Sequence, residues 1–100
     1  MRTKEYMRSI CDEADGALDY AQKSVRFSST RPEFGKMYRE MALDELKHAR
    51  YLREIGQTMM NEEKNPSYET EKSWLRCIRH LVEQETAVTM LLEDKQVVVV

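Results

Sequence analysis

The chain has 100 residues and a formal net charge of −2, with 41% of its residues hydrophobic and 34% charged. This is the length of one domain; the hydrophobic share excludes a disordered segment, and the charged share excludes a membrane protein. The nearly balanced charge gives no strong field for nucleic acid or an anionic membrane, so we expect neither as a partner. The first residues lack the apolar segment of a secretion signal, so a cytoplasmic location is expected.

The first long segment without proline predicts a helix over residues 3–26. Its composition favours helix, and the alternation typical of strands is not found over a useful length. At a spacing of three or four residues, one face is largely apolar but includes a carboxylate: Tyr6, Ile10, Glu13, Ala17, Tyr20 and Phe27.

A second helix is predicted over residues 31–61. Thr30 followed by Glu33 is the pattern of a capping box, and Pro32 fits the first helical turn, where its missing N–H costs nothing. The expected buried stripe is apolar except for two residues at its middle: Phe34, Tyr38, Met41, Glu45, His48, Leu52, Ile55 and Met59.

A third helix, over residues 67–94, follows a polar segment. Its stripe also contains one carboxylate: Trp74, Ile78, Leu81, Glu85, Val88 and Leu92. His80 and Glu83 are three residues apart and form a second candidate metal or entry site, although the plainer interpretation is a solvated or interfacial polar face. Residues 1–96 are therefore predicted to form one all-α domain, with residues 97–100 as a tail.

The carboxylates on these stripes need a compensating charge if they face the interior. A buried ionised carboxylate without a partner is costly, and neighbouring carboxylates repel each other. A divalent cation compensates both effects, and carboxylate with imidazole suits iron, manganese or zinc. Glu45 and His48 reach one ion from one helical face, and Glu13 is the matching carboxylate of the first helix. These three are the predicted metal ligands and catalytic residues, with Glu85 as a less central candidate.

Two segments of the chain resemble a known family. Residues 13–21 (EADGALDYA), followed after a turn by residues 41–49 (MALDELKHA), are similar to the first half of a ferritin-like domain, and the likeness covers residues 7–60. It is greatest to the short encapsulated ferritins and next to the helical part of rubrerythrins, although the Cys-x-x-Cys module of rubrerythrins is missing.

The resemblance implies a di-iron centre that oxidises Fe(II) and is bound by Glu13, Glu45 and His48. It also implies that Tyr20 lies near the metal. The sequence does not decide between iron and manganese.

One feature departs from the ferritin-like pattern: a complete domain has two Glu-x-x-His motifs, and this chain has one. One copy supplies half of the four-Glu, two-His set of di-metal helical bundles. We therefore predict a homodimer or higher oligomer, in which the first two helices of two copies form a four-helix bundle around the metals. The short encapsulated ferritins are built in this way. The resemblance adds a surrounding protein shell as a partner, which the sequence leaves open.

Two other functions stay open on the sequence. In the first, the protein is a non-enzymatic helical assembly module, and Glu13, Glu45 and His48 form a polar network without metal. In the second, the site binds a metal for structure only and does not oxidise iron. A lone Glu on an apolar stripe is usually a rim residue in water, and Glu-x-x-His also occurs by chance.

The two cysteines, Cys11 and Cys77, are far apart in the sequence. Two cysteines at this spacing form neither a disulfide framework nor a Cys-x-x-Cys metal knuckle. They agree with a location in a reducing compartment.

Overall fold

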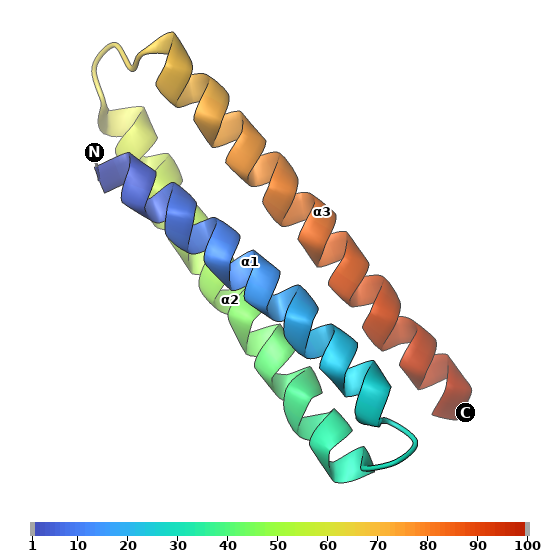
Figure 1. Cartoon of the computed structure of the whole chain (residues 1–100). Helices are drawn as coiled ribbons and strands as arrows, with labels where there is room; N and C mark the ends of the chain where they lie inside the picture. Colours follow the sequence, from blue (N-terminus) through green and yellow to red (C-terminus); the bar gives the residue numbers. More distant parts are fainter. Residues whose placement is uncertain (1, 100) are drawn as a thin grey trace.

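The computed structural model describes the backbone of residues 2–99 and the side chains of residues 3–93. It consists of α1 (Arg2–Phe27), α2 (Pro32–Glu62) and α3 (Tyr68–Val99), which run up and down beside one another (Figure 1). The described residues contain no strand, which confirms the predicted all-α fold. Together the helices form a rod of 53 × 17 × 16 Å.

The helix boundaries agree with the prediction except at the end of α3. This helix continues to Val99 instead of ending near residue 94. The side chains of the predicted tail, residues 97–100, lie outside the described residues. None of the described helices is long and apolar enough to span a bilayer.

The start of α2 follows the prediction only in part. Pro32 lies in the first turn as predicted, but the predicted capping box is wrong, because the N-cap residue is Arg31 and it makes no side-chain cap hydrogen bond. The carboxylate of Glu33 instead accepts a hydrogen bond from Arg31 Nε at 2.7 Å. The proline therefore starts this helix without help from Thr30.

The turn before α3 provides a side-chain cap. Ser67 Oγ accepts a hydrogen bond from the backbone N–H of Thr70 at 3.1 Å, so it satisfies one of the free donors of the first turn. Asn65 just before it has a φ of 58°, a left-handed conformation that asparagine tolerates better than most residues. The polar segment predicted to separate the last two helices thus forms a defined turn.

The central helix is α1, which packs along both α2 and α3, whereas α2 and α3 touch each other little. Small buried residues let α1 and α2 approach closely: Ala14, Ala17, Ala21, Ala42 and Ala49. The predicted stripe of α3 is largely confirmed, because Trp74, Leu81, Val88 and Leu92 are buried. The core is therefore formed mainly on the two sides of α1.

The predicted buried stripe of α2 is wrong for the single chain. Its large residues Phe34, Met41 and Ile55 are 37%, 40% and 44% exposed. The helix buries a neighbouring face of mostly small residues: Gly35, Ala42, Leu46, Ala49, Gly56 and Met60. Small side chains permit a closer approach of α1, and close packing outweighs the size of the apolar groups. Consequently α2 is apolar on two faces, and its own chain covers one of them.

Near one end of the rod, α3 contacts α2 directly. Trp74 is 5% exposed, and its Nε1 donates a hydrogen bond to Gln57 Oε1 at 3.0 Å. A Cβ atom on Gly56 would lie 2.7 Å from Trp74 Cη2, so the indole requires glycine at this position. Further along, Arg50 Nη2 pairs with Glu85 Oε2 at 2.9 Å and joins the same two helices.

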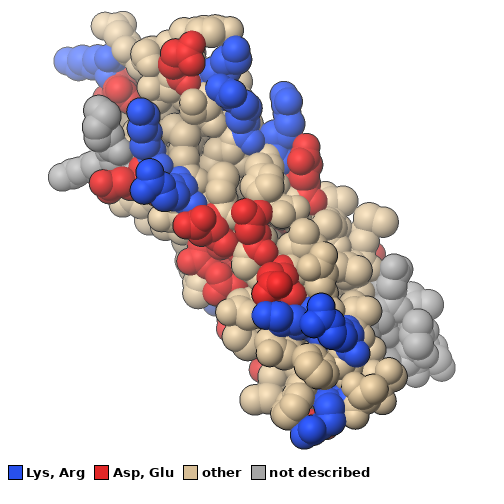
Figure 2. Space-filling model, viewed as in Figure 1, with Lys and Arg blue, Asp and Glu red and all other residues tan. Residues whose placement is uncertain are grey.

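The outer surface carries mixed charge and scattered apolar groups. On the face in Figure 2, acidic side chains gather half-way along the rod, with lysines and arginines toward both ends. The outward side of α3 exposes several apolar residues: Tyr68, Leu75, Val82 and Met90. The viewed face therefore has no large surface of one sign.

Candidate metal centre

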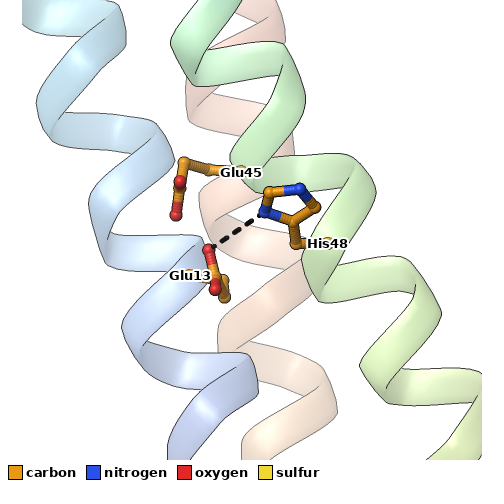
Figure 3. A group of neighbouring side chains, drawn as sticks. All are labelled: Glu13, Glu45 and His48. Carbon is orange, nitrogen blue, oxygen red and sulfur yellow. Dashed lines mark ion pairs between the residues drawn. The ribbon is translucent and has the colours of Figure 1, made fainter.

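The three predicted ligands converge in the structure. Glu13 of α1 meets Glu45 and His48 of α2, and one potential ligand atom from each lies within 4.8 Å of the others (Figure 3). Because α1 and α2 are antiparallel, residues distant in the sequence reach the same level of the rod. Among the described side chains, no other group of three His, Cys, Asp or Glu residues meets this criterion.

The site lies on one side of the α1–α2 hairpin, and α3 passes behind it in Figure 3. We define the hairpin face as this side, comprising Glu13 together with the α2 residues Phe34, Met37, Met41, Glu45, His48 and Ile55. The expectation of three inward-facing ligands holds only in part, because Glu13 and Glu45 are half-buried while the His48 side chain is 54% exposed. A single chain therefore presents the site at its surface.

Gly16 makes room for the carboxylate of Glu45. A Cβ atom at this position would lie 3.4 Å from Glu45 Oε2, which is ordinary van der Waals contact. Any larger side chain would project into the space that the carboxylate occupies. A glycine inside a helix often marks such a close approach, and this signal in the sequence was not used to predict the site.

The electrostatics of the site are unfavourable without a cation. Glu13 Oε2 is buried and has no hydrogen-bond partner. The imidazole of His48 is the nearest charge partner, with Nδ1 at 3.7 Å from this oxygen, too far for a hydrogen bond. The interaction with the Glu13 carboxyl group, followed by burial, raises the pKa of Glu45 to about 7, although His48 opposes the shift.

These residues fit a divalent metal ion. The unpartnered oxygen of Glu13 lacks a positive group, and two adjacent carboxylates repel each other when both are ionised. Two carboxylates and one imidazole form a donor set that suits iron, manganese or zinc. Three ligands per chain also leave coordination positions for further groups.

Glu45→Gln is expected to remove part of the pH dependence of stability of the metal-free protein. The folded chain raises the pKa of Glu45 from 4.5 to about 7, so between these values the folded state binds more protons than the unfolded state. The free energy of unfolding should therefore fall as pH rises through this window. We expect wild type to lose about 1–2 kcal/mol more than Glu45→Gln, allowing for the partial exposure of the carboxyl group.

Urea unfolding with a chelator at about pH 5 and about pH 8 measures this difference. Because every other titrating group is shared, the comparison between the two proteins isolates Glu45. Equal pH dependence in both proteins would contradict the shift.

Tyr20 lies on the same helix as Glu13 but about 10 Å farther along it, from the rise of an α-helix. Its ring stacks on Tyr38 of α2 with ring centroids 6.0 Å apart. Lys23 Nζ lies 5.8 Å from the centre of the Tyr20 ring. The structure thus places Tyr20 in an aromatic cluster beside the site and not among its ligands.

The remaining candidates on α3 lie outside the cluster. Glu85 Oε2 accepts hydrogen bonds from Arg50 Nε and Nη2 at 3.0 and 2.9 Å, so it has a structural partner. His80 contacts Asp15 of α1, with Nε2 2.6 Å from Oδ1, while Glu83 is exposed. The structure does not bring any of these residues to Glu13.

Asp15 was not singled out from the sequence, although it links α1 to α3. Besides His80, Gln84 Nε2 donates a hydrogen bond to Asp15 Oδ1 at 2.8 Å. Burial opposes the shift, but the hydrogen bonds of Gln84 and His80 lower the pKa of Asp15 below its ordinary value. Only the packing of α1 against α3 reveals this cluster.

The chain was compared with protein-family models, with curated proteins and with solved structures, and none of the three comparisons found a match.

Proposed function

We propose that two copies of this chain enclose a di-metal centre at the hairpin face and use it to oxidise Fe(II). The observation that carries the proposal is the convergence of Glu13, Glu45 and His48 within 4.8 Å, on the residues that resemble a ferritin-like motif. Two copies would supply four Glu and two His, the set of di-metal helical bundles.

The apolar surroundings of the ligands support pairing through this face. Four large apolar side chains of α2 are considerably exposed there: Phe34 (37%), Met37 (60%), Met41 (40%) and Ile55 (44%). A shallow pocket of about 390 Å³ lies at one end of the face and is lined by aromatic and methionine side chains: Phe27, Phe34, Met37, Tyr38 and Met41. Contiguous apolar surface of this kind is typical of an interface, and a second copy would remove it from water.

The ligands have distinct roles in this proposal. Glu13 and Glu45 hold the cation through carboxylate oxygens, and His48 does so through a ring nitrogen. Bound Fe(II) is the substrate, which gives its electron to dioxygen or peroxide, and the carboxylate-rich site favours the Fe(III) product. Because the pKa of Glu45 is raised to about 7, this residue releases a proton when the cation binds, and binding strengthens as pH rises through neutrality.

Metal content and native mass of wild type and Glu45→Ala test the proposal. We expect a wild-type dimer with about one metal per chain, as two shared metals require, and oxygen consumption after Fe(II) is added. Glu45→Ala should bind no metal, whereas Glu83→Ala, a change at an exposed carboxylate of α3, should behave as wild type. A metal-free wild-type monomer after Fe(II) addition would remove the proposal, and metal binding without oxygen consumption would leave a structural metal site.

A non-enzymatic assembly module is the second candidate. The proximity of His48 Nδ1 to Glu13 Oε2, 3.7 Å, and the raised pKa of Glu45 favour it, because a proton on Glu45 relieves the repulsion near neutral pH. In that case the hairpin face still joins two copies, but the polar cluster is neutralised by protons. A metal-free dimer in the same experiment would favour this function.

A further inference from the structure

We propose that Cys11 and Cys77 form a dithiol that hydrogen peroxide oxidises to an intramolecular disulfide between α1 and α3. The two residues are separated by 66 positions in the sequence, yet their Sγ atoms lie 3.8 Å apart. Both are free thiols. Neither belongs to the Glu13, Glu45 and His48 cluster, so the proposal does not depend on the metal centre.

The surroundings favour a link between these two sulfurs over other products. Cys77 is 5% exposed and lies in an apolar cluster against which Cys11 packs. Its Sγ also contacts the backbone oxygen of Met7 at 3.5 Å. A buried sulfur held in this way is shielded from thiols of other molecules, while its sulfur neighbour is already in contact. An S–S bond of about 2.0 Å requires the sulfurs to approach by roughly 1.8 Å, within the reach of side-chain rotation.

The two cysteines differ in their access to an oxidant. Cys11 is half-buried and Cys77 is buried. Burial raises the pKa of Cys77 to about 12, so this residue stays a neutral thiol. Peroxide therefore reacts first at Cys11, and Cys77 resolves the product.

The reaction proceeds in two balanced steps. The thiolate of Cys11 attacks one oxygen of hydrogen peroxide, the O–O bond breaks, and the leaving hydroxide takes up a proton to give water and a sulfenic acid. The sulfur of Cys77 then attacks Cys11 Sγ, the S–O bond breaks, and a second water carries away the proton of Cys77. Two thiols and one peroxide give one disulfide and two waters.

The link would strengthen the weakest attachment in the fold. Because α3 has little contact with α2, it is held to the hairpin mainly through α1. A disulfide between Cys11 and Cys77 closes most of the chain into one loop and makes this attachment covalent. Such a loop restricts the unfolded chain strongly.

Peroxide treatment of the full chain, with a chelator present, tests the inference. We expect wild type to lose both titratable thiols, to lose two hydrogen atoms in intact mass and to remain a single covalent chain. Its Tm should rise by about 10 °C or more, and dithiothreitol should reverse the rise.

Cys11→Ser and Cys77→Ser serve as matched controls and should show neither the link nor the rise in Tm. Because Cys77 is buried, Cys77→Ala is a second variant, and circular dichroism checks that each variant is helical. Wild type that keeps both thiols, gains oxygen atoms in mass, or cross-links only between chains would overturn the inference.

Discussion

Ile55→Glu is expected to convert the dimer into a monomer and to abolish metal binding, although it leaves all three ligands of the chain in place. Ile55 is 44% exposed on the hairpin face and lies two helical turns beyond His48. In the proposed dimer it would be covered by the second copy, and a buried carboxylate without a partner costs several kcal/mol. We expect the dimer to weaken by about 100- to 1,000-fold. The metal should be lost with it, because one chain supplies half of the ligand set.

Val82→Glu is the matched control for this change. Val82 is 48% exposed, close to the value of Ile55, but it lies on the outward side of α3. This variant should keep the native mass and the metal content of wild type, measured by light scattering and elemental analysis. A metal-loaded Ile55→Glu monomer would show that one chain suffices, and an unchanged dimer would place the interface elsewhere.

Gly16→Leu is expected to reduce metal affinity by about 10- to 100-fold, the range found when support of a metal ligand is lost. The added side chain would occupy the space of the Glu45 carboxylate, because even a Cβ atom lies 3.4 Å from Glu45 Oε2. The carboxylate would have to turn away from Glu13. Titration with Fe(II) or Mn(II) under anaerobic conditions measures the affinity.

Gly16→Ala separates this steric effect from a general effect on the helix. Its single methyl group fits in ordinary contact, and alanine favours helix over glycine by about 1 kcal/mol. This variant should therefore bind metal as wild type does and unfold at a higher urea concentration. If Gly16→Leu kept full affinity, the carboxylate of Glu45 would have no part in binding.

The sequence predicts part of the candidate site, because that part depends on one helix alone. Glu45 and His48 share a face through their spacing, and any α-helix would bring them together. The meeting of Glu45 with Glu13 depends on the register of the antiparallel hairpin, which the positions of the turns only approximate. Tyr20 illustrates the same limit, since the sequence puts it on the correct face but its stacking partner, Tyr38, comes from the other helix.

The sequence by itself determined the three helices, their turns and the buried face of α3, because these follow from local spacing, proline and polar segments. Only the tertiary structure decided which face of α2 meets α1. Large and small apolar residues form neighbouring stripes on that helix, and periodicity cannot rank them. Close approach of two backbones selects the stripe with Ala42 and Ala49 and leaves Met41 and Ile55 exposed. The contact of Cys11 with Cys77 likewise arises from packing across the whole chain, which no local pattern encodes.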